Sequence, residues 1–161
     1  LLINVSNFDP AHISYLMIIA GAGMVLGNIL GGYLADKKEP IVAAIFLLSL
    51  MVFSLILVFF LSQNQITSVI LTFICGVLAM SIGTPINMVM VRNAKNSVML
   101  AASFMQAAFN VANSLGAFFG GIPLMFGLSF IYPALVGAFM AFLGLVLSVI
   151  FYIKYIKKGK I

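Results

Sequence analysis

Three amide side chains follow one another along an apolar stretch of this sequence at helical spacing. Gln106, Asn110 and Asn113 stand at positions i, i+4 and i+7, so a helix would present all three on one face. An amide in an apolar medium is costly unless it is hydrogen-bonded. Because carboxamides donate and accept hydrogen bonds without carrying charge, this face suits an uncharged, polyhydroxyl or base-like solute. Hydrogen bonds between packed helices would use the same residues equally well.

A second polar group surrounds Pro85, which stands between Thr84 and Asn87 in another apolar stretch. A proline inside a helix removes one backbone hydrogen bond and clashes with the preceding turn, so we predict that Pro85 kinks or opens its helix. Breaks of this kind in transporter helices often mark the substrate path. We therefore predict Asn87 as a fourth solute-contacting residue, with a purely structural kink as the alternative.

The residue types present give little support to catalysis or metal binding. Asp9, Asp36 and Glu39 are the only carboxylates, and all three lie in predicted turns. The sequence shows no metal-ligand cluster, no pair of catalytic acids, no nucleophile with a base and no phosphate-binding loop. We therefore predict no enzymatic activity, no cofactor and no metal site. A membrane-embedded enzyme stays open only if a catalytic domain lies upstream.

The composition places these side chains in a membrane. Hydrophobic residues make up 64% of the chain and charged residues 7%, against about 45–50% and about 25% in soluble domains. Several apolar runs exceed the roughly 20 residues that span a bilayer, and the alternation typical of an outer-membrane barrel is absent. We predict an all-α membrane protein that contacts the lipid bilayer.

Five transmembrane helices account for the apolar runs. The second of them is almost uniformly apolar, and we expect it to face lipid. Residues 1–11 are expected to form the end of a preceding helix and an outer loop, and residues 12–161 one transmembrane bundle with a basic tail at 154–161. The predicted spans are 12–35, 41–61, 66–91, 97–122 and 131–153.

The distribution of Lys and Arg predicts the topology. All eight occur in the first and third turns between spans or in the tail, and the second and fourth turns have none. Because cytoplasmic loops carry the excess of Lys and Arg, the tail is predicted to be cytoplasmic and the amino end outside. The net charge of +5 is thereby explained by topology, and we expect no nucleic-acid partner.

The first predicted span carries a row of glycines. Gly23, Gly27 and Gly31 are four residues apart and share one helix face. In lipid, such a face lets a neighbouring helix approach closely. Asn28 stands among these glycines, and we expect it to bond the backbone of that neighbour.

The end of this span, GNILGGYLADKKEP, resembles the loop signature of the major facilitator superfamily, G-x-x-x-D-[RK]-x-G-[RK]-[RK]. Gly32, Asp36 and Lys37 match its first glycine, its aspartate and the following basic residue. Glu39 and Pro40 replace its Gly-Arg. Three further stretches resemble the arabinose-efflux-type permeases of the drug:proton antiporter branch: PINMVMVRNA, ASFMQAAFNVANSLGAFFGG and GLSFIYPALVGA.

This resemblance implies a twelve-helix transporter of a bacterial inner (plasma) membrane, in which the five spans are helices eight to twelve. Its missing N-terminal half would be a partner within the same polypeptide, and the absence of a methionine at Leu1 agrees with that expectation. The resemblance also assigns Gly32, Asp36 and Lys37 to a cytoplasmic network that steadies one conformation.

We therefore predict that the protein exports a small solute, such as a sugar, a purine or a drug-like compound, by alternating access. The resemblance implies exchange against protons, with the coupling carboxylate in the absent half. The alternative is a non-transport membrane scaffold or assembly subunit, in which the amide face of residues 106–113 would hold helices together.

Overall fold

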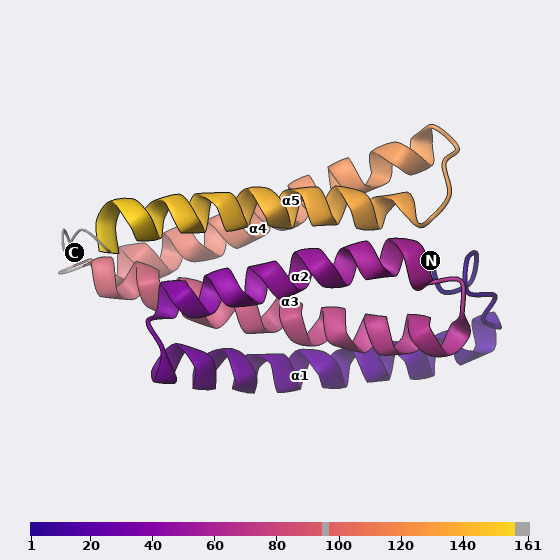
Figure 1. The fold of residues 1–161 in the computed structure, drawn as a ribbon, viewed down its shortest axis with the longest axis horizontal. Helices are drawn as coiled ribbons and strands as arrows, with labels where there is room; N and C mark the ends of the chain where they lie inside the picture. Colours follow the sequence, from indigo (N-terminus) through magenta and orange to yellow (C-terminus); the bar gives the residue numbers. More distant parts are fainter. Residues whose placement is uncertain (95–96, 157–161) are drawn as a thin grey trace.

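The computed structural model describes residues 1–94 and 97–156, and every regular element in that part of the chain is a helix (Figure 1). All five α-helices are long and apolar enough to cross a membrane. The prediction of an all-α membrane protein with five spans is confirmed. The elements are the short helix η1 (Pro10–His12), α1 (Ile13–Lys37), α2 (Pro40–Leu61), α3 (Gln65–Asn93), α4 (Val98–Met125), α5 (Tyr132–Phe151) and the π-helical turn η2 (Tyr152–Ile156).

The turns between the helices have causes in the sequence. Pro40 is the first residue of α2, where its missing N–H leaves nothing unpaired. Asn64 caps α3, because its side-chain oxygen accepts a hydrogen bond from the amide of Ile66 at 2.9 Å. Gly127 adopts a φ of 73° after α4, a conformation that glycine takes without strain. Each turn reverses the chain, so consecutive helices are antiparallel. As a result, α1 and α3 run in the same direction, and they lie side by side (Figure 1).

The closest helix contact joins α1 to α3 through the glycine row. A Cβ added at Gly23 would lie 2.7 Å from the carbonyl oxygen of Phe73, and one added at Gly27 or Gly31 would overlap the backbone of α3 outright. All three glycines are buried. The predicted close approach along this face is confirmed. In order along α1, the glycines meet the backbone of Phe73, Val77 and Ser81.

Ser81 adds a polar link to this contact. Its hydroxyl donates to the carbonyl oxygen of Gly27 on α1 at 2.8 Å and to that of Val77 on its own helix at 2.7 Å. Pro85, four residues on, has no N–H to offer the Ser81 carbonyl, and Gly31 packs against that carbonyl instead. The helix does not open at Pro85, since α3 is continuous over Gln65–Asn93.

The second helix differs from the expectation that it faces lipid. It packs against both α3 and α5, and it has more buried side chains than any other described helix. Phe46, Phe53 and Phe60 form its exposed side. For the opposite side of α2, which packs against α3 and α5, the expectation was wrong. A uniformly apolar helix suits a protein interior as well as lipid. The buried side includes Ala43, Ala44, Leu47 and Leu48.

A serine cluster fixes the segment before α1 to the turn between α2 and α3. The Ser6 hydroxyl donates to the carbonyl oxygen of Ser62 at 2.6 Å and lies 2.8 Å from the hydroxyl of Ser68. All three serines are buried. Gln65 adds a hydrogen bond from its side-chain amide to the carbonyl oxygen of Asn7 at 3.0 Å. Polar contacts therefore help to hold this end of the bundle together.

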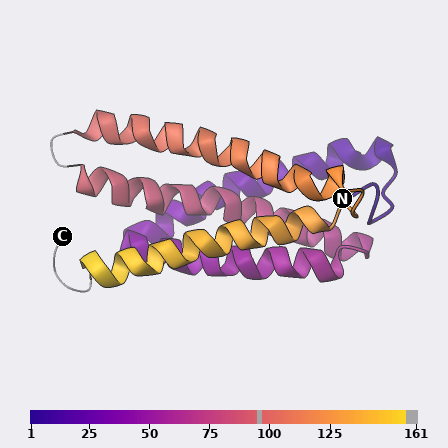
Figure 2. The same cartoon turned by 90° about the horizontal axis from the view of Figure 1, so that it is seen from above.

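The fourth helix is the least buried of the five. It lies along one margin of the bundle, where Figure 2 shows it in salmon to orange, and packs against α5 and α3. Pro123 is its one buried residue. The amide-rich stretch predicted to contact a solute thus belongs to the helix whose surface is most open among the described residues.

Candidate solute-binding site

An open cavity of about 310 Å³ lies between α1, α3 and α4. Four of its lining side chains carry uncharged hydrogen-bonding groups, and the others are apolar or glycine. None of the nine lining residues is ionisable. The lining consists of Asn28 from α1, then Ala79, Met80, Gly83, Thr84 and Asn87 from α3, and Met105, Gln106 and Phe109 from α4.

Two of the four predicted solute-contacting residues meet in this cavity. Asn87 comes from α3 and Gln106 from α4, so the site joins two helices that are consecutive in sequence. Thr84 lies one turn before Asn87 on the same helix and also lines the cavity. The wall can therefore donate and accept hydrogen bonds from several directions without presenting a charge to the cavity.

The other two predicted residues lie outside the cavity lining. Asn110 and Asn113 are exposed on α4, and the backbone carbonyl of Asn110 accepts a hydrogen bond from the Ser114 hydroxyl at 3.0 Å. In Figure 1, α4 diverges from α3 toward its C-terminal end. Gln106, nearer the N-terminal end of α4, is therefore the amide that stays close to α3.

The close contact of α1 with α3 positions the third amide of the cavity. Asn28 follows Gly27, whose carbonyl accepts the Ser81 hydrogen bond. Asn28 is exposed and lines the cavity, whereas we expected it to bond the neighbouring backbone. The expectation followed from its glycine neighbours, but the residue after Gly27 points away from the contact because one helical step turns it by about 100°.

Met105 and Phe109 were not predicted as site residues. Both line the cavity beside Gln106, and Phe109 stands three residues after it on the same helix face. The spacing was available in the sequence, but apolar residues at that spacing are common in any membrane helix. An aromatic ring beside amides gives a flat surface for a sugar or a base.

The segment that resembles the superfamily loop signature lies at the opposite end of α1 from the serine cluster. Asp36 is exposed, and its side chain makes no ion pair with any residue that the structure describes. The ammonium of Lys37 lies 4.6 Å from the centre of the Tyr33 ring. Gly32 is half-buried, and an added Cβ there would meet no atom within 4 Å.

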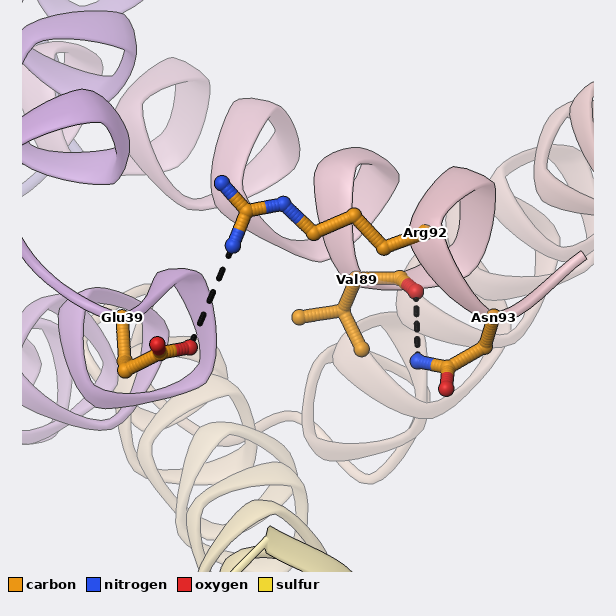
Figure 3. A network of polar contacts seen from close by, with 4 residues as sticks. All are labelled: Glu39, Val89, Arg92 and Asn93. Carbon is orange, nitrogen blue, oxygen red and sulfur yellow. Dashed lines mark hydrogen bonds and ion pairs between the residues drawn. The ribbon is translucent and has the colours of Figure 1, made fainter. Parts of the chain in front are cut away.

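A neighbouring ion pair joins α2 to α3 at the same end. Arg92 reaches Glu39, with 3.9 Å between the guanidinium nitrogen and the carboxylate oxygen, and both side chains are more than half exposed (Figure 3). Asn93 donates its amide to the carbonyl oxygen of Val89 at 2.8 Å. Exposed pairs of this kind stabilise a fold by about 0–1 kcal/mol, so this contact can form and break easily.

The basic residues of the described chain gather at this end. Lys37 and Lys38 end α1, Arg92 lies in the last turn of α3, and Lys154 follows α5, so all four occur at the left end of the bundle in Figure 1. Lys95, Lys157, Lys158 and Lys160 lie outside the described residues. No group of three or more metal-ligating side chains occurs among residues 1–94 and 97–156.

Comparison with known proteins places this architecture in a family. The sequence model of the Major Facilitator Superfamily matches residues 2–160. AraJ of Escherichia coli (strain K12) is 33% identical over 138 residues, which cover 86% of this chain and 35% of that protein. The "Inner membrane transport protein YdhP" of the same strain is 32% identical over 144 residues, or 89% of this chain and 37% of that protein.

A "Probable sugar efflux transporter" of Haemophilus influenzae (strain PittGG) is 25% identical over 155 residues, which cover 96% of this chain and 38% of that protein. The chain thus spans a little over a third of the length of these relatives. No solved structure matches it significantly. With the family match over almost every residue and five membrane-length helices, the chain belongs to the major facilitator superfamily.

Proposed function

We propose that this chain forms the C-terminal half of a transporter that exports a small, uncharged polar solute by alternating access. The observation that carries the proposal is the cavity between α1, α3 and α4, whose polar groups are all amides or hydroxyls. Such walls suit a solute with many hydroxyl groups or a nucleobase, and Phe109 offers a ring face to either. Names of relatives such as "Probable sugar efflux transporter" support export of a sugar.

Proton coupling would require an acid that this chain does not place in the membrane interior. Asp9 caps η1, Asp36 lies in the last turn of α1, and Glu39 precedes α2. We therefore propose that the coupling carboxylate belongs to a part of the transporter outside this sequence. Proton-driven solute exchange by residues 1–161 alone in liposomes would contradict this assignment.

The basic end is proposed to face the cytoplasm and to act in the conformational switch. Lys37, Lys38, Arg92 and Lys154 at one end agree with the positive-inside rule. A cysteine introduced at Lys154 should react with an impermeant maleimide only when the cytoplasmic face is accessible. Labelling from the outside in intact cells would reverse the proposed orientation.

Within the switch, Gly32, Asp36 and Lys37 are proposed to form a contact that exists in one of the two transport conformations. Asp36 is exposed and unpaired with the described residues, so it is available to a partner when the halves move. Asp36→Asn should therefore change the maximal transport rate and leave solute affinity nearly unchanged. Equal losses in both quantities would place Asp36 in the binding machinery instead.

The cavity is tested with single amide deletions in the polypeptide that contains this chain. Gln106→Ala and Asn87→Ala should each weaken transport of the solute by about five-fold, because each removes a hydrogen bond of about 1 kcal/mol. Efflux is measured from cells loaded with a panel of labelled sugars and purines. The matched control is Ser49→Ala on α2, whose exposed hydroxyl bonds only the Ile45 carbonyl of its own helix at 2.8 Å.

The outcome also separates the transporter from a scaffold. If Gln106→Ala and Asn87→Ala leave efflux unchanged but weaken assembly, the amides hold helices together and the transport proposal fails. Asn110→Ala and Asn113→Ala extend the test along α4. A graded loss from Gln106 to Asn113 would indicate that the solute path continues toward the outer end of that helix.

A further inference from the structure

A second, chemically different hollow lies at the basic end of the bundle. It is an open groove of about 300 Å³ between α2, α3 and α5. It begins at the second residue of α2 and reaches the last residue of α5, so it lies at the membrane boundary rather than at mid-depth. The groove is lined by Ile41, Ile86, Val89, Met90, Leu147, Ser148 and Phe151.

The wall of this groove offers a ligand almost nothing but hydrocarbon. None of its seven lining residues is ionisable. Ser148 is its single hydroxyl, and that group already donates to the Gly144 carbonyl of its own helix at 2.8 Å. The groove therefore suits an alkyl chain, in contrast to the amide-lined cavity between α1, α3 and α4.

Two cations follow lining residues of the groove in the chain. Arg92 follows Val89 by one turn on α3, and Lys154 follows Phe151 by three residues in η2, at the same end of the bundle. Glu39, immediately before α2, lies 3.9 Å from Arg92 and offsets part of its charge. Among the residues that the structure describes, this end of the groove thus has two cations and one anion beside an apolar channel.

We infer that the groove holds an acyl chain of an anionic phospholipid, whose phosphate lies at Lys154 and Arg92. The argument is charge complementarity, since basic groups between membrane helices attract anionic headgroups while the channel behind them accepts the hydrocarbon. The site lies on the membrane face that the positive-inside rule makes cytoplasmic. The groove shares no lining residue with the cavity between α1, α3 and α4.

The experiment compares two lipids that differ in headgroup charge. The full polypeptide containing this chain is purified in detergent and incubated with phosphatidylglycerol or phosphatidylcholine of identical acyl chains. Lipid retained by the protein is counted by native mass spectrometry. We expect phosphatidylglycerol to be retained in preference to phosphatidylcholine, because only the former carries a net negative charge.

Two charge variants have opposite expected effects. Lys154→Gln should lower retention of phosphatidylglycerol by about five-fold, and Glu39→Gln should raise it, because the first removes an attraction and the second a repulsion. Lys37→Gln is the matched control, since that lysine ends α1 and lies over Tyr33 rather than beside a lining residue. Equal retention of the two lipids by the unaltered protein, or equal effects of Lys154→Gln and Lys37→Gln, would overturn the inference.

A fourth variant tests the channel itself. Ser148→Leu adds apolar volume to the groove without leaving a backbone group unpaired, because the Ser148 hydroxyl bond to Gly144 only supplements the helix hydrogen bonds. Retention of both lipids should fall while the helical circular-dichroism signal and melting temperature stay unchanged. Undiminished retention in this variant would show that the acyl chain lies elsewhere and would overturn the assignment of the groove.

Discussion

Replacing Gly27 by alanine probes the contact between α1 and α3 at its tightest point. The added Cβ would overlap the carbonyl oxygen of Val77 and would lie 2.9 Å from its carbonyl carbon. Ordinary carbon–carbon contact begins near 3.5 Å, so the two helices would have to move apart by roughly 0.6 Å or more. The obstacle is backbone, which cannot rotate away as the end of a side chain could.

The expected loss of stability follows from that separation. Overpacking of a dense contact destabilises a protein by about 1–3 kcal/mol. Moving the helices apart also stretches the 2.8 Å hydrogen bond from Ser81 to the Gly27 carbonyl, and bonds of this kind between membrane helices contribute about 0.6 kcal/mol on average. We therefore expect Gly27→Ala to lower the free energy of unfolding by about 2–3 kcal/mol.

The assay is reversible unfolding of the purified polypeptide in mixed micelles, followed by circular dichroism. Gly21→Ala is the matched control, because it makes the same substitution in the same helix at a position where no atom lies within 4 Å of the added Cβ. If Gly27→Ala and Gly21→Ala unfold at the same denaturant concentration, α1 and α3 are not in the contact described, and the reasoning fails.

Three further substitutions test contacts that were described above. Ser81→Ala removes the hydrogen bond from α3 to α1 and should lower the free energy of unfolding by about 0.6 kcal/mol in the same micelle assay. An unchanged value would mean that the contact depends on the glycines alone. Ser6→Ala leaves the buried carbonyl of Ser62 without that donor and should destabilise the end of the bundle that holds the serine cluster by about 1–2 kcal/mol, seen as faster amide exchange at the start of α3. Unchanged exchange would refute the link. Arg92→Gln breaks the exposed pair with Glu39 and should shift stability by less than about 1 kcal/mol, so a large loss would reveal a further partner of Arg92.

Much of the fold was predictable because membrane helices follow simple rules of length and hydropathy. The glycine row was predictable too, since a four-residue spacing puts Gly23, Gly27 and Gly31 on one face whatever that face meets. The side of α2 that is buried was not, because hydropathy does not distinguish lipid from a protein interior. The serine cluster was likewise missed, since Ser6 and Ser62 are far apart in sequence and belong to segments without periodicity.

The candidate site was predictable only within each helix. The shared face of Gln106, Asn110 and Asn113 follows from spacing, but the sequence does not contain the angle at which α4 leaves α3. That angle decides that Gln106 lines the cavity beside Asn87 while Asn110 and Asn113 do not. The prediction that Asn28 bonds the backbone of the neighbouring helix was wrong for a similar reason. Gly27 before it is packed against α3, whereas the Asn28 side chain lines the cavity.

The in-register contact of α1 with α3 also limits how this part of the chain can change in length during evolution. Each glycine of the row meets a residue 50 positions later, from Gly23 with Phe73 to Gly31 with Ser81. A single residue inserted inside α1 between Gly23 and Gly31 would rotate everything after it by about 100° and turn the following glycine out of the contact. An insertion in the turn between α1 and α2 would change that numerical offset and leave the facing glycines in place. Among variants of this sequence, length differences should therefore collect in that turn, and gains or losses inside α1 or α3 should occur in whole helical turns.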